Sequence, residues 1–154
     1  MKEIDLGAKI SIYPYNELSE GDKNLIAKSK EAQEGAYAPY SEFYVGAAVE
    51  CGGNIVIGSN QENEAYPSGM CAERVAVYSA SAQYPMAVIE TIAISAYNKT
   101  ANEEALAFPC GACRQVLLEY EKRQNTPIRI VVYAKDEAYI IESVKSLLPL
   151  SFNI

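Results

Sequence analysis

The feature that most constrains the fold of this chain is a set of cysteines placed where helices are predicted to begin. Cys110 and Cys113 form a Cys-X-X-Cys motif directly after Pro109. Proline is favoured at the start of a helix, and residues three apart share one helix face, so both thiols are expected on one side of a first turn. Cys71 is expected to open the preceding helix in the same way, with Glu73 two residues further on. A fold that uses all three thiols together must place two helix N-termini side by side.

Three convergent thiolates predict a tetrahedral zinc site with one open position. The partial positive charge of a helix N-terminus favours thiolate over thiol, and a water in the open position becomes acidic and nucleophilic. The stretch from Cys71 to Cys110 is long enough for a helix, a strand and a loop. Two parallel crossovers can therefore bring the two helix starts together.

Helical and extended segments alternate along the chain. The helical stretches are 19–35, 70–82 and 110–123, and the strand-like stretches are 44–50, 54–59, 88–97 and 128–134. A shorter strand is predicted at 139–142, a last turn at 146–148 and an extra edge strand at 4–13. Strands rich in β-branched residues that each follow a helix are typical of a sheet with crossover helices. The prediction is a single α/β domain over 1–154, with three layers and a mixed sheet inside.

Charge excludes several classes of partner. Lys and Arg total 13 against 20 Asp and Glu, which gives a net charge of −7 and a pI near 4.7. Because nucleic-acid binding depends on cations and the only basic run is Lys122-Arg123, no nucleic-acid partner is expected. No apolar run approaches the roughly 18 residues of a membrane span, and the first residues do not resemble a signal peptide. We expect a soluble cytoplasmic protein without a membrane partner, in which cysteines serve metal or redox chemistry rather than disulfides.

The cysteines allow two readings other than an open zinc site. Cys110 and Cys113 alone could be a thioredoxin-like redox pair, but that reading leaves Cys71 and Glu73 unexplained. A closed structural zinc site could use Cys51 as its fourth ligand. Since Cys51 precedes two glycines in a predicted hairpin turn, it is more simply read as a small apolar residue.

Several segments together resemble a known family. Cys71-Ala-Glu-Arg, followed by Pro109-Cys-Gly-Ala-Cys-Arg-Gln, is similar to the signature of zinc cytidine deaminases. The chain contains no histidine, so only the three-cysteine variant of the free-nucleoside enzymes is available. Residues 37–48, 60–63 and 147–152 also resemble the family's segments, in the family's order. The resemblance implies a three-layer α/β/α cytidine deaminase-like fold.

The resemblance also implies roles for individual residues. One zinc per chain would be held by Cys71, Cys110 and Cys113, and Glu73 would move protons during hydrolysis. The substrate would be contacted by Asn60 and Glu62 at the ribose, by Phe43 at the nucleoside ring and by the backbone amide of Ala72 at the pyrimidine carbonyl. The chain would form a homotetramer in which Phe152 enters a neighbouring subunit's active site.

Charge counting adds a further expectation. Zinc with three thiolates carries one net negative charge, which opposes ionisation of a bound water, so a cation must offset it. Arg74, three residues after Cys71, and Arg114, next to Cys113, are the candidates, with both helix dipoles. An ordinary surface ion pair is the alternative role for each arginine.

The predicted function is zinc-dependent hydrolytic deamination of cytidine and deoxycytidine to uridine and deoxyuridine, with release of ammonia, in pyrimidine salvage. Two positions depart from the family's usual residues: Glu64 replaces a small residue, and Phe108 replaces a small polar one. The first alternative is therefore a deaminase of another amino-heterocycle such as blasticidin S. The second is a non-catalytic zinc or thiol-redox protein.

Overall fold

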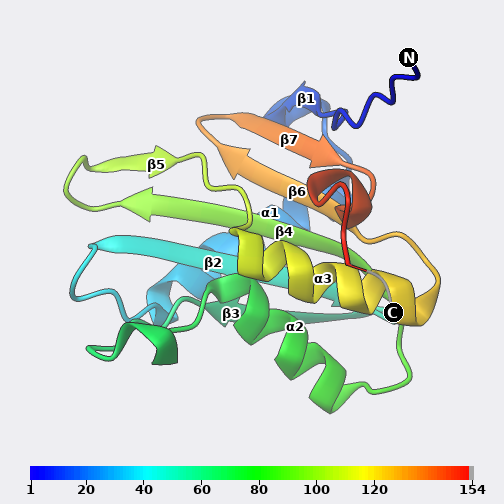
Figure 1. The fold of residues 1–154 in the computed structure, drawn as a ribbon. Coiled ribbons are helices and arrows are strands. Elements are labelled where there is room, and N and C mark those ends of the chain that lie inside the picture. Colours follow the sequence, from blue (N-terminus) through cyan, green and yellow to red (C-terminus); the bar gives the residue numbers. More distant parts are fainter. Residues whose placement is uncertain (153–154) are drawn as a thin grey trace.

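A central sheet lies between one helix on one face and two helices on the other (Figure 1). The computed structural model describes residues 1–152. Its strands are β1 (Ser11–Pro14), β2 (Phe43–Cys51), β3 (Asn54–Ser59), β4 (Ile89–Asn98), β5 (Glu103–Ala105), β6 (Arg129–Ala134) and β7 (Glu137–Ile141). Its helices are α1 (Glu20–Ala32), α2 (Ala72–Gln83) and α3 (Gly111–Gln124), with short 3-10 turns η1 (Tyr15–Glu17), η2 (Gln33–Gly35), η3 (Tyr66–Ser68) and η4 (Val144–Leu147). The predicted three-layer α/β/α fold with a mixed sheet is confirmed.

The sheet order is β1-β7-β6-β4-β2-β3, with β5 paired to β4. Among the strands within residues 1–152, only β4 and β6 are parallel neighbours, while the other pairs are antiparallel. Since β3 and β4 are each antiparallel to β2, they run in the same direction. The connections β3–α2–β4 and β4–α3–β6 are therefore the two parallel crossovers that the cysteine spacing predicts. They place the first turns of α2 and α3 at the same end of the sheet.

Alternating residues of the central strands feed two separate hydrophobic cores. On β2, Ala47 and Val49 belong to the core under α2 and α3, whereas Ala48 belongs to the core under α1. On β4, Ile92 and Ala93 divide in the same way. Because both faces are covered, these strands are apolar almost throughout, as the sequence shows.

Gly58 on β3 lets α2 approach the sheet closely. A Cβ at this position would lie 2.5 Å from the Ala76 nitrogen and 2.9 Å from the Ala72 carbonyl oxygen, both backbone atoms of α2. No other residue type fits without moving the helix. The position of the first turn of α2 thus depends on a glycine in the strand beneath it.

A buried carboxylate joins α3 to the end of the chain. Glu121 accepts hydrogen bonds from the backbone nitrogens of Ile128 (2.9 Å) and Val144 (2.8 Å) and from the Ser143 hydroxyl (2.6 Å). A third nitrogen, that of Lys145, lies 3.3 Å from the same carboxylate. These bonds fix the start of β6 and η4 against the helix.

Three local predictions are corrected by the structure. The stretch 19–35 is not one helix, because α1 ends at Ala32 and a 3-10 turn follows. The predicted edge strand over 4–13 forms only at Ser11–Pro14, where it pairs with β7. Because β7 ends at Ile141, one residue beyond the partner of Ser11, the residues before Ser11 have no strand to pair with on that side. Cys51 does not lie in the hairpin turn: it is the last residue of β2 and pairs with Asn54, leaving Gly52 and Gly53, both with positive φ, as the turn.

No helix of the part described, residues 1–152, has the length and apolar character needed to cross a membrane.

Candidate metal centre and substrate pocket

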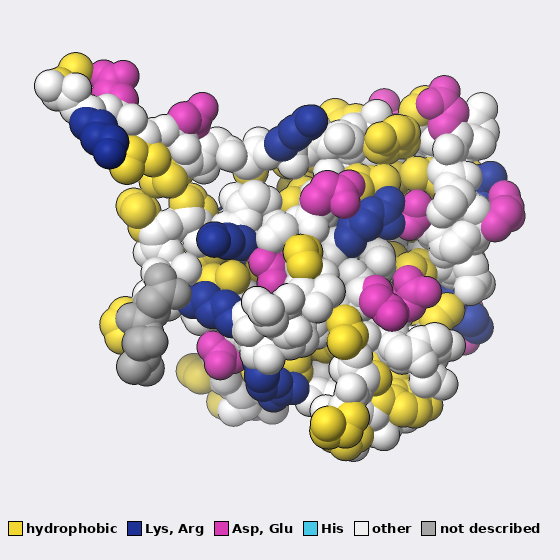
Figure 2. Space-filling view, turned by 90° about the vertical axis from the view of Figure 1, so that its right-hand side faces the viewer, with side chains coloured by type: hydrophobic (Ala, Val, Ile, Leu, Met, Phe, Trp, Pro, Cys, Tyr) yellow, Lys and Arg dark blue, Asp and Glu magenta, His cyan; other side chains and the backbone are white. Residues whose placement is uncertain are grey.

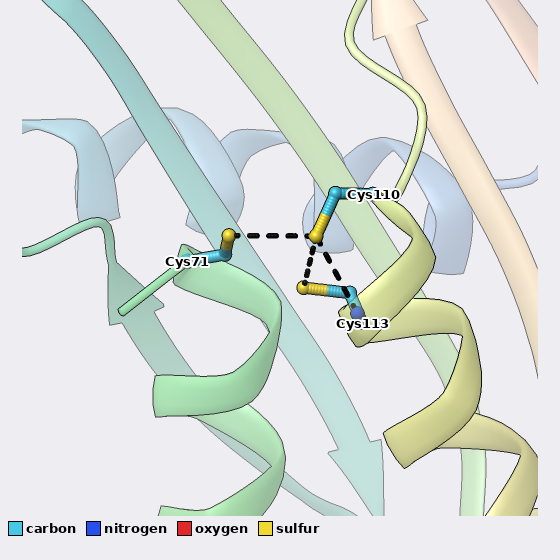
Figure 3. A group of neighbouring side chains, drawn as sticks. All are labelled: Cys71, Cys110 and Cys113. Carbon is cyan, nitrogen blue, oxygen red and sulfur yellow. Dashed lines mark hydrogen bonds between the residues drawn. The ribbon is translucent and has the colours of Figure 1, made fainter. Parts of the chain in front are cut away.

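Three cysteine sulfurs converge where α2 and α3 begin (Figure 3). Cys71 precedes the first residue of α2, Cys110 precedes the first residue of α3, and Cys113 lies in the first turn of α3. All three sulfurs lie within 4.8 Å of one another. The sequence prediction that two helix starts bring these thiols together is confirmed.

The sulfur spacing fits a tetrahedral zinc ion. A zinc–sulfur bond of about 2.3 Å implies tetrahedral edges of about 3.8 Å between sulfurs. The sulfurs of Cys71 and Cys110 are 3.7 Å apart, and those of Cys110 and Cys113 are 3.4 Å apart. Small shifts of the side chains suffice to seat the ion, so the donor set is suited to zinc in both chemistry and size. Cys51, buried at the far end of β2, is not a member of this group.

The site favours negative charge on sulfur. Hydrogen bonding from Cys113, Arg74 and Cys110 lowers the pKa of Cys71 to about 5, against the opposing effect of burial. The pKa of Cys113 is raised, because its proton is shared with the Cys71 sulfur and because the side chain is buried. These contacts therefore favour the thiolate form of Cys71. The sulfur of Cys110 also accepts from the Cys113 backbone nitrogen at 3.5 Å, as an N-cap does.

The two candidate arginines have different partners. A terminal nitrogen of Arg74 donates to the Cys71 sulfur at 3.6 Å, and this contact raises the pKa of Arg74. The Nε of Arg74 is buried and has no hydrogen-bond partner among the described residues. Arg114 instead donates to the carbonyl oxygens of Pro109 (2.8 Å) and Leu147 (3.2 Å). The hydrogen bonds of Arg114 therefore tie the loop before α3 to η4, whereas Arg74 supplies positive charge at a sulfur.

Glu73 lies beside the cysteines in the first turn of α2 and is only 5% exposed. Burial raises the pKa of its carboxyl, and the negative charge of Cys71 raises it further. Raising the pKa of a carboxyl makes it a better proton acceptor, and its protonated form remains able to donate the proton again. This is the chemical behaviour that an acid–base catalyst needs.

A pocket of about 750 Å³ opens onto the metal centre. Of the residues expected to contact substrate, the structure places Phe43, Asn60, Glu62 and Ala72 in its lining, together with Glu73, Cys71 and Cys110. Phe108, one of the two departures from the family pattern, also lines it and packs edge-on against Tyr139, 5.9 Å between ring centroids. The size is that of an ordinary small-molecule site.

Asn60 and Glu62 hold other parts of the pocket wall. Asn60 accepts from the Val45 nitrogen at 2.8 Å and donates to the Phe43 carbonyl at 2.9 Å, which fixes the start of β2. Glu62 accepts from the Tyr40 nitrogen at 2.8 Å and from the Ser41 hydroxyl. These bonds lower the pKa of Glu62, so its carboxylate stays ionised despite partial desolvation. Sequence reasoning missed this loop-holding contact because Ser41 is 21 residues away.

Phe152 does not line this pocket. Its side chain is 76% exposed, and its carbonyl oxygen accepts from the Lys122 ammonium at 3.0 Å. The exposed side chain is free of its own pocket, and its place in a neighbour's site stays a prediction.

Comparison with known proteins supports one family. Residues 19–128 match the family model described as "Cytidine and deoxycytidylate deaminase zinc-binding region". A cytidine deaminase of Sporosarcina psychrophila is 43% identical over 99 residues, which cover 64% of this chain and 68% of that protein. The crystal structure of cytidine deaminase from Burkholderia pseudomallei has a TM-score of 0.71 and 35% identity, covering 88% of this chain and all of the other. The structure of the Mycobacterium tuberculosis enzyme gives a TM-score of 0.63 at 30% identity, covering 86% of this chain and 97% of that one.

Proposed function

The chain belongs to the cytidine and deoxycytidylate deaminase zinc-binding family, and from that premise we propose that it hydrolyses cytidine and deoxycytidine to uridine and deoxyuridine, releasing ammonia. The observation that carries this proposal is the geometry of one corner of the pocket. Three sulfurs at tetrahedral spacing lie beside a buried glutamate, and Glu73, Cys71 and Cys110 line a cavity large enough for a nucleoside. A redox pair would need neither Cys71 nor Glu73.

Cys71, Cys110 and Cys113 would hold one zinc ion per chain. Zinc in such a site supplies Lewis acidity, which lowers the pKa of a water so that it can attack at neutral pH. With three thiolates and a divalent ion, the centre carries one net negative charge. Arg74, bonded to the Cys71 sulfur, offsets that charge in our proposal, and the helix N-termini contribute partial positive charge.

Glu73 is proposed as the group that moves protons. It accepts a proton from the attacking water, whose oxygen forms the new bond to carbon 4 of the cytosine ring. The carboxyl gives this proton to ring nitrogen 3, then takes the remaining water proton from the new hydroxyl on carbon 4 and passes it to the exocyclic amine. The bond between carbon 4 and that amine breaks, and ammonia leaves. Water and cytidine are thereby converted to uridine and ammonia with no other reactant.

The remaining pocket residues position the nucleoside. We assign Phe43 to packing against the ring, the Ala72 amide to the pyrimidine carbonyl, and Asn60 and Glu62 to the ribose hydroxyls. Asn60 already uses one lone pair and one N–H on the backbone of β2, and it retains one of each for a sugar. Glu62 is ionised, so a 5′-phosphate near it would be repelled, which favours nucleosides over nucleotides.

The assembly, location and pathway are also proposals. We propose a homotetramer whose active sites are shared, a single domain over the whole chain, a cytoplasmic location and a role in pyrimidine salvage. The exposure of Phe152 supports the shared site, since a phenyl ring gains little where it stands and would exclude water over a neighbour's substrate.

The central experiment combines metal analysis with a substrate panel. We expect about one zinc per chain, and ammonia release from cytidine and deoxycytidine but not from deoxycytidine monophosphate or adenosine. Zinc without turnover on any of the four would indicate a non-catalytic zinc protein. Turnover of a different amino-heterocycle in place of cytidine would move the assignment to the first alternative.

The shared site is tested by mixing two proteins that are each impaired at a different part of the site. Phe152→Ala should weaken nucleoside binding and leave zinc content unchanged, whereas Leu150→Ala, at a residue 88% exposed on the same segment, is the matched control. Subunit exchange between Phe152→Ala and Glu73→Ala proteins should restore part of the activity. Confirmed exchange without recovery would place Phe152 outside its neighbours' sites.

A further inference from the structure

The segment before β1 has the alternation of an amphipathic strand, yet it forms no strand in this structure. Positions 4, 6, 8, 10 and 12 are apolar, and the intervening positions are Glu3, Asp5, Gly7, Lys9 and Ser11. We call residues 1–10 the arm. Every residue of the arm is exposed, and none belongs to a helix or strand. The arm also precedes the region matched by the family model, residues 19–128, so the proposed function does not use it.

The arm exposes large apolar side chains. Ile4 is 75% exposed, Leu6 45% and Ile10 40%. Figure 1 shows the arm leaving the body at the N label, and Figure 2 shows it standing away from the rest of the surface at the upper left. A period-two apolar pattern is a strand signal, and exposed strands of this kind tend to find a partner edge.

A place for a partner strand exists beside the arm. β1 is the last strand of the sheet, and its outer edge has no partner strand within residues 1–152. The pairing of β1 with β7 stops at Ser11, opposite Ile140, while β7 ends at Ile141. The arm therefore continues past its neighbour with neither edge paired to a strand.

The arm is complementary to itself in the antiparallel direction. When two copies are paired about Gly7, Asp5 of each copy faces Lys9 of the other, which gives two cross-strand ion pairs. In the same register Ile4 faces Ile10, and Leu6 faces Ala8. Residues directly opposite share a face, so all the apolar side chains gather on one side of the pair and the ion pairs on the other. We propose that the arm pairs with the arm of a second copy of this chain, antiparallel and centred on Gly7.

The fold would support this pairing at both ends. In the same register, residues Met1 to Glu3 of one arm lie opposite Ser11 to Tyr13 of the other copy, along the outer edge of β1. Each arm thereby adds a strand to its partner's sheet, which matters because an isolated two-stranded ribbon is only marginally stable. The pair also meets an apolar surface, since a cleft of about 460 Å³ lies between the arm and the C-terminal segment. Its lining includes Leu6, Leu148 and Pro149.

Charge argues for a second copy rather than a membrane. The charged side chains of the arm are Lys2, Glu3, Asp5 and Lys9, which cancel. Binding to an anionic lipid surface is favoured by an excess of positive over negative side chains, and the arm carries equal numbers of the two. The order of its charges is complementary to that of a second arm running in the opposite direction.

A disulfide test reads the register directly. In a Gly7→Cys protein the new thiols face one another across the two-fold axis, within the Cα separation of about 4.4–6.8 Å that a disulfide needs. We expect a cross-linked dimer on mild oxidation, identified by mass spectrometry of the arm peptide. Ala8→Cys is the matched control, because its thiols would be diagonal neighbours beyond that range. Equal cross-linking of the two variants, or none in either, would overturn the proposal.

A charge exchange tests the ion pairs in the same background. Gly7→Cys proteins that also carry Asp5→Lys or Lys9→Asp should each cross-link with themselves in lower yield, by on the order of tenfold. When the two are co-expressed, opposite charges face again, and the mixed dimer should dominate. Yields that do not respond to these charges would refute the register.

This outcome is separable from the proposed function. Gly7, Asp5 and Lys9 lie outside the catalytic and substrate-binding residues, so cytidine turnover by the same samples reports on the active site alone. Full turnover without cross-linking would reject the arm pairing and leave the deaminase assignment standing.

Discussion

Replacing Gly58 by alanine should damage catalysis from beneath the metal centre. The added Cβ would lie 2.5 Å from the Ala76 nitrogen, about 0.9 Å short of ordinary van der Waals contact at 3.4 Å. The obstructing atoms belong to the backbone of α2, so no change of side-chain rotamer relieves the contact. The helix must therefore move away from β3 by nearly the missing distance.

The Gly58→Ala substitution should lower stability, catalytic rate and zinc affinity, because α2 carries residues of the site. Overpacking of this kind costs about 1–3 kcal/mol of unfolding free energy, which exceeds the roughly 0.5–1 kcal/mol that alanine gains over glycine in a strand. Cys71 and Glu73 move with the helix, and a misplacement of about 1 Å can reduce a rate by about 10²-fold. Zinc ligation tolerates only about 0.2 Å, so zinc affinity should fall as well.

The assay compares Gly58→Ala with Gly111→Ala. A Cβ at Gly111 meets nothing within 4 Å, although this residue lies between two of the sulfur ligands. We expect Gly111→Ala to be at least as stable as the unmodified protein in urea unfolding and to match it in zinc content and kcat/KM for cytidine, and Gly58→Ala to lose in all three. A Gly58→Ala protein with unchanged kcat/KM and stability would refute the argument that this contact positions the site.

Three further outcomes are expected. Glu73→Ala should keep zinc and lose about 10²–10⁴-fold in kcat, because the carboxylate is assigned to proton transfer rather than to metal binding; loss of the metal would show that the role is wrong. Cys51→Ala should retain one zinc per chain and full activity, and zinc loss would instead support a closed four-cysteine site. Glu121→Gln should lower the unfolding free energy by about 1–3 kcal/mol in urea titrations, because an amide cannot accept from all the donors that face the carboxylate. An unchanged urea midpoint would show that these hydrogen bonds do not stabilise the fold.

The layers and the convergence of the cysteines were predictable because local signals carry them. Apolar strands covered on both faces, with helices between them, indicate a crossover sheet. Pro109 before a Cys-X-X-Cys motif indicates a helix start. Each signal depends on a few neighbouring residues, and the folded chain forms the element that each one predicts. The helices begin and end within about two residues of the predicted positions, except where the first becomes a 3-10 turn.

What sequence reasoning missed depends on contacts between distant residues. β5 has only three residues, two of them glutamates, and is a strand solely because β4 lies beside it. Arg74 and Arg114 each adjoin a cysteine motif, but only the first hydrogen-bonds a sulfur, because the second turns toward the carbonyl of Leu147. The importance of Gly58 was equally hidden, since it arises from the backbone of a helix packed above it.

The attachment of the chain's end to α3 has a genetic consequence. Arg114 and Glu121 fasten the segment around η4 to the helix that supplies two of the sulfurs, while Leu150 and Phe152 beyond it are turned outward. In an assembly that shares its sites, a mutation of Phe152 alters a neighbour's pocket and leaves the mutant chain's own metal geometry intact. An allele that inactivates the cysteine and Glu73 site and an allele that alters Phe152 would then complement each other when expressed together. Substitutions at Phe152 could also change substrate preference during evolution while every intermediate sequence keeps its metal ligands.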